Sequence, residues 1–487
     1  MSERKLKEQV FSGMFWRLLE RVCAQGVSFI LSIILARILM PDDYGTIALL
    51  LIFINIANVF VTNGLGEALV QAKHVEKKDF STILYCGLFF AVIIYAVLFV
   101  TSPYIAVFYG DDKLIWMLRV FALKIPISAF NSVQQAYVQR NMLFRKFFMA
   151  TLGGTVLSGI IGIIMAYQGY GAWALIVQYL VNSVVDTIVL FFSIDCRPTL
   201  EFSMEAARRY IKYGWKLTAG ALINIVYEEL RSLIIGKKYS SSDLAFYNKG
   251  SQFPKLIVSN LNVALNSVLF PAFVTKNHSG EGVKGIMRKS IRVNTYLIFP
   301  FMVGIGVIAE PLIELLLTRK WLECVPYLRI MCFYNAYVPI AAIDSQGIKA
   351  IGRSDVFLKM TLVRRIIYLM LLLLVMEKGV FAIALTSVVN VVIAFLVNGI
   401  FVKKYIGYGL KERIIDLLPQ IGLSLIMGVA VYCVGFLHVP AYIKLIVQVL
   451  GCVAVYLGLS EVFKLDLYLY LKDFLVNYFR KKAVGRE

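Results

Sequence analysis

The stretch Phe15–Leu39, FWRLLERVCAQGVSFILSIILARIL, indicates the fold class of this 487-residue chain. Most of its residues are apolar, and a helix of this length can cross the roughly 30 Å hydrocarbon core of a bilayer. Similar apolar runs recur along the chain, which is 59% hydrophobic and only 16% charged. Soluble domains carry about 25% charged residues. Because the runs are continuous rather than alternating, we predict an all-α polytopic membrane protein.

The apolar runs predict about fourteen spanning helices. Their expected positions are 11–39, 44–70, 80–102, 114–140, 146–168, 171–194, 213–236, 246–272, 289–318, 325–350, 355–376, 379–402, 413–437 and 440–462. An even number of spans places both termini on the same side of the membrane. Lys and Arg gather in alternate loops, beginning with the N-terminus, so the positive-inside rule assigns both termini to the cytoplasm. This orientation accounts for much of the net charge of +20, and we expect no nucleic-acid partner.

The two halves of the chain resemble each other at an offset near 200 residues. The first alignment pairs LMPDDYGTI at 39–47 with YSSSDLAFY at 239–247 and places Asp43 over Asp243. A second alignment pairs MLRV at 117–120 with YLRI at 327–330. Six helices in each repeat give the two halves the same orientation in the membrane. Transporters with such halves place their substrate between them.

We therefore predict two pseudo-symmetric six-helix lobes followed by two C-terminal helices. The tail is amphipathic and basic, which favours a position along the inner membrane surface. The expected divisions are 1–205 for the first lobe, 206–404 for the second, 405–463 for the last two helices and 464–487 for the tail.

Polar side chains form stripes on several predicted spans. The spacing places each stripe on one helical face. Interhelical hydrogen bonds would explain some amides and hydroxyls. A charge at mid-bilayer costs about 2.5–3.5 kcal/mol, however, so the cations favour a hydrated, basic central cavity. The candidate cavity residues on these stripes are Asn58, Lys124, Asn131, Arg231, Lys255 and Asn262.

Two further groups of charges lie within predicted spans. Arg364 and Arg365 precede an apolar run too short to cross the bilayer alone, so at least one of them should face the cavity. Arg17, Glu20 and Arg21 share a face of the first span. We interpret this triplet as a charged entrance on the cytoplasmic half of the cavity, and an interfacial N-terminal collar is the alternative.

Three carboxylates are candidates for coupling transport to an ion gradient: Asp186, Glu228 and Glu67. No GxxxxGK[ST] motif for ATP binding occurs in the sequence, so the energy should come from a proton or sodium gradient or from downstream consumption of the substrate. A packing role for Asp186 is the alternative. The seven cysteines and three histidines are scattered, so we expect no metal site and no cofactor.

The predicted cavity suits an anionic, hydroxyl-rich substrate. Arginine offers a planar fork that matches phosphate oxygens, and amides and hydroxyls supply the donors and acceptors that sugars need. This chemistry alone does not separate a lipid-linked sugar from an organic anion.

Three features narrow the choice of substrate. They are the predicted arrangement of six, six and two helices, the stretch LLERVCAQGVSFILSIILARILMPDDYGTIAL at 18–49 and the stretch LRSLIIGKKYSSSDLAFYNKG at 230–250. Over essentially its whole length the chain resembles the polysaccharide transporter family of the MOP (multidrug/oligosaccharidyl-lipid/polysaccharide) superfamily. These are the Wzx-type flippases of O-antigen, exopolysaccharide and teichuronic acid pathways. The resemblance implies two lobes around a central cavity, with a MATE-like fold and alternating access rather than enzymatic activity.

The resemblance also implies the substrate and the place of action. The substrate would be an undecaprenyl-diphosphate-linked oligosaccharide, moved from the inner to the outer leaflet of the bacterial cytoplasmic membrane. Membrane lipids, a polysaccharide polymerase and export machinery are the implied partners. Related peptidoglycan-precursor flippases require arginines in the first helix, which Arg17 and Arg21 match. The pair Glu228–Glu229 stands where family members often have an acidic residue.

Two other function classes remain open. A multidrug or small-organic-ion antiporter of the same superfamily would need an acidic or aromatic cavity. A membrane-embedded glycosyltransferase or polymerase would need catalytic carboxylates or a large extracytoplasmic loop. The excess of basic residues and the short predicted outer loops favour the flippase.

Overall fold

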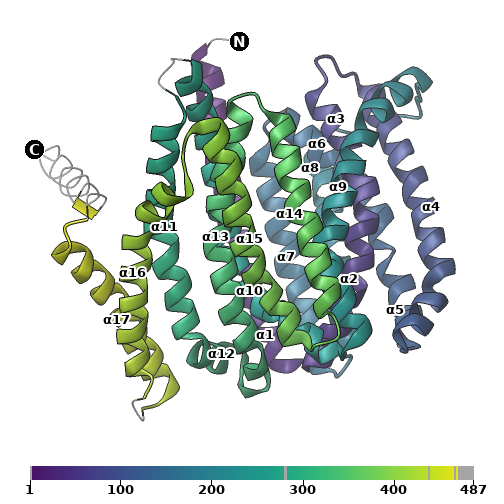
Figure 1. Cartoon of the computed structure of the whole chain (residues 1–487). Helices are drawn as coiled ribbons and strands as arrows, with labels where there is room; N and C mark the ends of the chain where they lie inside the picture. The colour runs from purple at the N-terminus through teal and green to yellow at the C-terminus, as the bar shows by residue number, and fades with distance from the viewer. Residues whose placement is uncertain (1–2, 279–281, 437–438, 466–467, 470–487) are drawn as a thin grey trace, which may run out of the picture. The chain divides into compact units, whose positions relative to one another are not determined.

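The computed structural model describes residues 3–278, 282–436, 439–465 and 468–469. Every regular element in these residues is a helix (Figure 1). In chain order the helices are α1 (Glu3–Ile38), α2 (Pro41–Thr62), α3 (Leu65–Gln71), α4 (Lys77–Tyr109), α5 (Lys113–Phe121), α6 (Lys124–Arg140), α7 (Phe144–Tyr167), α8 (Ala172–Ser193), α9 (Met204–Lys238), α10 (Ser241–His278), α11 (Lys284–Val307), α12 (Ala309–Leu317), the 3₁₀ helix η1 (Arg319–Cys324), α13 (Val325–Ala350), α14 (Ser354–Val375), α15 (Val380–Ile406), α16 (Leu410–Val434) and α17 (Ala441–Val462).

Each of the fourteen predicted spans coincides with one helix or with two consecutive helices. The spans expected at 44–70, 114–140 and 289–318 are each divided in two, as α2 and α3, α5 and α6, and α11 and α12. Nine of the spans in the described residues are long and apolar enough to cross a membrane. The remaining helices include α9, α10 and α14, whose charged and amide side chains lower their hydropathy. They include Arg231, Lys255, Asn262, Arg364 and Arg365, which the sequence assigns to a cavity.

Large apolar side chains cover the outside of both parts of the chain. Phe192 of α8 is 75% exposed and Leu374 of α14 is 74% exposed. The cores beneath are equally apolar, with Leu50 and Ile54 of α2 buried in the first half of the chain and Met287 and Val402 buried in the second. A surface this apolar fits a hydrocarbon environment.

The helices pack into two compact units, Met1–Ala245 and Phe246–Glu487. In the first unit, α7 packs against α1 and α8, and α6 packs against α4 and α8. In the second unit, α11 packs against α13 and α16, and α17 packs on α16 (Figure 1). The packing boundary follows residue 245 rather than residue 205, because α9 packs against α2, α3 and α4. The division into lobes at 205 and 206 stays a prediction.

The helix packing repeats in the two halves. The third and fourth helices of each repeat are in contact, as α4 with α6 and α11 with α13. The fourth and sixth are in contact as α6 with α8 and α13 with α15. The aligned aspartates also act alike: the Asp43 carboxylate accepts a hydrogen bond from Met40 N at 3.0 Å, and the Asp243 carboxylate accepts one from Ser240 N at 3.2 Å. Each carboxylate caps the start of its helix.

The aligned arginines form a second matched pair. Arg119 Nε donates to the Phe99 carbonyl at 3.3 Å and to Ser102 Oγ at 2.9 Å. Arg329 Nε donates to the Gly306 carbonyl at 3.1 Å. Each arginine thereby joins the fourth helix of its repeat to the end of the third. The structure supports the internal repeat that the sequence predicts.

Candidate functional site

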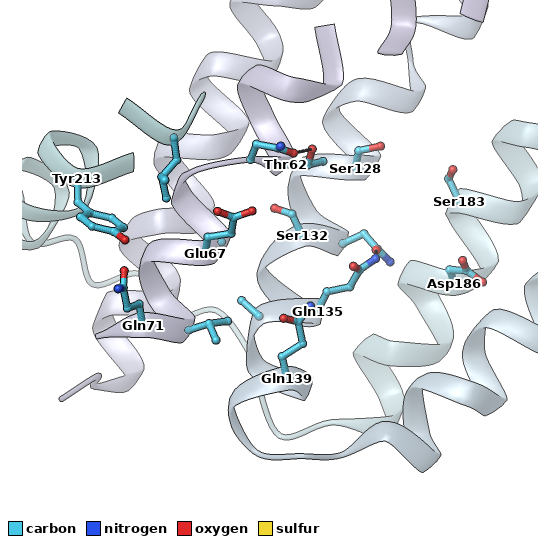
Figure 2. A pocket seen from close by; sticks show the side chains of 16 residues that line it. Thr62, Glu67, Gln71, Ser128, Ser132, Gln135, Gln139, Ser183, Asp186 and Tyr213 are labelled. Carbon is cyan, nitrogen blue, oxygen red and sulfur yellow. Dashed lines mark hydrogen bonds between the residues drawn. The ribbon is translucent and has the colours of Figure 1, made fainter. Parts of the chain in front are cut away.

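The first unit contains a polar cavity of about 870 Å³. Its walls come from α2, α3, α6, α8 and α9 (Figure 2). Four lining residues are small or apolar: Gly66, Val70, Ala136 and Leu217. Amide and hydroxyl side chains provide most of the surface: Thr62, Asn63, Gln71, Ser128, Asn131, Ser132, Gln135, Gln139, Ser183 and Tyr213. The two acidic lining residues are Glu67 and Asp186.

A break between α2 and α3 shapes one wall of this cavity. Gly64 has a φ of 91°, a backbone conformation that favours glycine. A Cβ atom at Gly64 would lie only 2.5 Å from the Gly214 carbonyl oxygen of α9. Thr218 of α9 donates to the Asn63 carbonyl at 2.8 Å, so the break is held against α9. The short helix that follows then presents Glu67 to the cavity (Figure 2).

A single arginine joins the end of α6 to the end of α3. Arg140 Nη1 donates to the carbonyls of Leu69 at 3.1 Å and Ala72 at 2.5 Å. Arg140 Nη2 donates to the carbonyl of Lys73 at 3.1 Å. These bonds satisfy carbonyls that the end of α3 leaves without helical partners. They also hold the α3 wall of the cavity against the α6 wall.

We predict that Arg140→Lys destabilises the first unit by about 2 kcal/mol, because a lysine cannot replace the guanidinium fork. A lower denaturation temperature of the purified protein would measure the loss. Arg145→Lys is the matched control, because Arg145 is exposed and stacks near the Trp16 ring, where a lysine can also lie. An equal loss in both variants would contradict a specific role for Arg140.

Two side chains that line the cavity, Asn131 and Asp186, differ in their hydrogen bonding. Asn131 Nδ2 donates to Thr187 Oγ1 at 3.3 Å, and Asn131 Oδ1 accepts from Gln135 Nε2 at 2.5 Å. By contrast, Asp186 Oδ1 is buried and has no hydrogen-bond partner among the described residues. Its electrostatic neighbours are Lys124 and Glu20. One oxygen of this half-buried carboxylate is therefore buried without a donor, which is energetically unfavourable.

Lys and Arg are absent from the described lining of this cavity. Lys124 lies one helical turn before Ser128, but its ammonium packs 5.1 Å from the centre of the Tyr179 ring. The lining therefore carries acidic rather than basic charge. This cavity is not the basic chamber that the sequence predicts.

Of the predicted site residues, the cavity lining brings together Glu67, Asn131 and Asp186. Arg17 and Glu20 of α1 are not among the described lining residues. Arg17 is exposed, lies 3.6 Å from Glu20 and stacks over the Phe147 ring of α7. The side chain of Arg21 lies outside the described residues.

The remaining predicted residues are distributed over other helices of the two units. Asn58 and Asn262 occupy aligned positions in the repeats, and each has a buried Oδ1 without a partner in the described part of the chain. Arg231 is half-buried on α9 and Lys255 is exposed on α10.

Glu228 is exposed, and the neighbouring Glu229 accepts a hydrogen bond from Asn55 of α2 at 3.1 Å. Arg364 and Arg365 are half-buried on α14. Arg364 Nε donates to a carbonyl of its own helix at 3.3 Å.

Sequence reasoning missed a buried ionic cluster in the second unit. Arg413 of α16 donates to the Asp344 carboxylate of α13, and both side chains are buried. Asn398 of α15 donates to the same carboxylate at 3.2 Å. Asp344 is the one acidic residue of the span predicted at 325–350, and this isolation is a signal that could have identified it.

A second group of charges in this unit joins α11 to α16. The buried Asp416 of α16 accepts hydrogen bonds from Arg288 and Arg292 of α11. Within the described residues, no cluster of His, Cys, Asp and Glu could hold a metal ion.

Comparison with known proteins identifies the family. Residues 34–326 match the sequence pattern of the polysaccharide biosynthesis protein family. The chain belongs to this family. The succinoglycan biosynthesis transport protein ExoT of Rhizobium meliloti is 24% identical over 351 residues, which cover 72% of this chain and 71% of ExoT. The lipopolysaccharide biosynthesis protein WzxC of Escherichia coli is 21% identical and covers 88% of both chains.

Solved structures confirm the fold of this polysaccharide biosynthesis protein. The lipid II flippase MurJ, in an inward closed conformation, superposes with a TM-score of 0.72 at 15% identity and covers 94% of this chain and 99% of its own. An inward-facing multidrug resistance MATE family transporter of the MOP superfamily superposes with a TM-score of 0.59 at 14% identity, covering 80% and 98%. The predicted fold class and the resemblance to this family are confirmed. The protein is a multi-pass membrane protein with the MOP fold.

Proposed function

We propose that this protein is a flippase that moves undecaprenyl-diphosphate-linked oligosaccharides from the inner to the outer leaflet of the bacterial cytoplasmic membrane. The observation that carries the proposal is a large polar cavity inside a membrane-embedded unit of a polysaccharide biosynthesis protein. Its volume of about 870 Å³ lies at the upper end of small-molecule sites. Its amides and hydroxyls supply the donors and acceptors that sugar hydroxyls require. Transport leaves the glycan bonds intact, so the protein is not an enzyme.

The position of the cavity fits loading from the cytoplasm. Gln71, Gln139 and Tyr213 line it at the predicted cytoplasmic ends of their spans. This orientation rests on the positive-inside rule, which assigns both termini to the cytoplasm. The glycan would enter from that side while the lipid tail stays in the bilayer. The lobes 1–205 and 206–404 would then expose the bound glycan to one side of the membrane at a time. The helices of 405–463 and the tail 464–487 lie outside the predicted repeat.

The diphosphate would be bound by basic residues outside the cavity. Arg17, Arg21, Arg231, Arg364 and Arg365 offer guanidinium groups, and Lys124 and Lys255 offer ammonium groups. Guanidinium forks match phosphate oxygens, and pairs of this kind are stronger away from water.

We expect Asp186→Asn to reduce gradient-driven transport at least about tenfold, which corresponds to about 1.4 kcal/mol in the transport barrier. The unpaired Asp186 carboxylate is a candidate group for a coupling proton or sodium ion, and an amide cannot exchange a proton. Glu67 and Glu228 are the other candidates. Initial transport rates in vesicles, with and without an imposed proton or sodium gradient, would test the prediction.

Asp195→Asn provides the matched control, because Asp195 is exposed just beyond the end of α8. Equal rates for the Asp186 variant and the wild type in an imposed gradient would exclude Asp186 from ion coupling.

The flippase proposal can be tested with the purified protein in lipid vesicles. The probe is a fluorescent polyprenyl diphosphate that carries one N-acetylglucosamine. A membrane-impermeant quencher then reports how much probe reaches each leaflet. Vesicles with the protein should equalise the leaflets faster than empty vesicles. Equal rates in both would contradict the proposal.

One observation favours a second candidate, a multidrug or organic-cation antiporter. The cavity lining has two carboxylates and no described basic side chain, which a cation would tolerate. Flat organic cations also need aromatic or apolar walls, whereas Tyr213 is the one aromatic side chain among the described lining residues. The amide-rich lining and the family membership favour the sugar. Ethidium efflux from the same vesicles would support the antiporter.

A further inference from the structure

We infer that the cavity of the first unit is the subsite for the glycan and that it selects uncharged sugars over acidic ones. The inference rests on the proposed function and deepens it, because it names the chemical class of the sugar. It also separates recognition of the glycan from recognition of the diphosphate. The charge and the hydrogen-bonding groups of the lining both support it.

The charge of the lining disfavours acidic sugars. Glu67 and Asp186 lie on opposite sides of the cavity, with Ser132 and Gln135 between them (Figure 2). A uronate bound between these carboxylates would meet like charge from both sides. Like charges facing each other in a binding site are strongly unfavourable. Lys124 is an electrostatic neighbour of Asp186, and its ammonium lies beside the Tyr179 ring, outside the described lining of the cavity.

The hydrogen-bonding groups of the lining suit uncharged sugars. Gln71 on α3 and Gln139 on α6 are exposed side chains that line the cavity. Each amide offers two donors and an acceptor, which can bind hydroxyl and N-acetyl groups. Gln135 uses its NH₂ group to donate to Asn131, and its carbonyl oxygen can accept from a sugar hydroxyl. The lining thus provides both donors and acceptors without a basic side chain.

The same lining is unsuited to the diphosphate. A diphosphate needs cationic donors, and the described lining provides none. The lipid-linked diphosphate must therefore lie outside this cavity while the sugars extend into it. This division predicts that sugar selectivity can be altered in the first unit without loss of lipid-diphosphate binding.

The test uses soluble saccharides, so that the cavity is probed without the lipid. The full chain in lipid nanodiscs is titrated with an N-acetylglucosamine trisaccharide and with a galacturonic acid trisaccharide, and binding is followed by saturation-transfer NMR. We expect the neutral trisaccharide to bind at least about tenfold more tightly, a ratio typical of one unfavourable charge contact.

Three variants make the inference specific. Glu67→Gln should raise the ratio of uronate affinity to neutral-trisaccharide affinity about tenfold, because it removes one like charge and keeps a polar group. The double variant Gln135→Ala with Gln139→Ala should weaken neutral binding about tenfold. Gln168→Ala is the control, because Gln168 is an exposed glutamine at the end of α7 outside the cavity. It should behave as the wild type.

The outcomes distinguish this inference from the proposed function. Equal binding of the two trisaccharides, or an unchanged ratio in Glu67→Gln, would overturn the selectivity. Failure of both trisaccharides to bind would overturn the glycan subsite. Selective trisaccharide binding without movement of the polyprenyl diphosphate probe between leaflets would keep the subsite and contradict the flippase.

Discussion

Replacing Asp344 with alanine is expected to destabilise the second unit by about 3–5 kcal/mol. Asp344 of α13 is 0% exposed and Arg413 of α16 is 1% exposed, and the two side chains form an ion pair. Asn398 donates to the second oxygen of the carboxylate at 3.2 Å. Without Asp344 the guanidinium would remain buried with no counter-charge. The expected result is a large loss of folded protein in the membrane and a lower denaturation temperature.

Two further variants test whether the loss of stability comes from the unpaired buried charge of Arg413. The double variant Asp344→Leu with Arg413→Met should recover most of the lost stability, because it removes both charges at similar volume. Asp355→Ala breaks an ion pair with Arg353 in which both side chains are about half exposed. It should leave the stability unchanged. If Asp344→Ala is as stable as the wild type, the buried guanidinium of Arg413 does not need Asp344 as its counter-charge.

The stability of this pair has a consequence for the architecture. The ion pair of Asp344 and Arg413 joins α13 to α16. The contacts of Asp416 with Arg288 and Arg292 join α16 to α11. The first of the two helices after the predicted repeat, α16, is thus attached to α11 and α13 by ion pairs of the buried Asp344 and Asp416. Loss of Asp344 should therefore release α16 before it disturbs the helices of the first unit.

Gly64→Ala is expected to abolish transport and to destabilise the first unit by about 2–5 kcal/mol, from backbone strain and overpacking together. The φ of 91° at this position is strained for alanine. The added methyl group would also overlap the backbone of Gly214 in α9. Relief of this overlap would move α3 away from α9 and displace Glu67 and Gln71 from the cavity wall. Transport in vesicles and the denaturation temperature would measure the two effects.

Gly110→Ala is the matched control for the effect of backbone strain alone. Gly110 also has a positive φ, of 75°, but a Cβ atom there would have no neighbour within 4 Å. It should lose some stability and keep transport. If Gly64→Ala transports as well as Gly110→Ala, the contact between α3 and α9 is not needed for the cavity.

Much of the fold could be predicted from the sequence, because the length and polarity of a span are local properties. Each apolar run became one helix or a pair of helices, and the aligned aspartates Asp43 and Asp243 form matching caps. The division of span 44–70 into α2 and α3 was not predicted. It depends on Gly64 meeting Gly214 of α9, a residue far along the chain.

Part of the candidate site could also be predicted from periodicity. The stripe of the fourth span included Asn131, and one more turn of the same spacing would have added Gln139. Ser183 gave no such signal, because it joins the lining only through the packing of α8 beside α6. The sequence alone thus indicated polar faces on some helices of this cavity, but not its complete lining.

The sequence by itself determined the helical form of the spans and the internal repeat, because a bilayer selects apolar length along the chain. Only the tertiary structure decided the charge of the cavity and the partner of each buried ion. Lys124 carries the basic charge expected of a cavity, yet it packs beside Tyr179 while Glu67 and Asp186 reach the lining. The physical reason is that the electrostatics of a site depends on which side chains of different helices meet, and spacing within one helix does not contain that information.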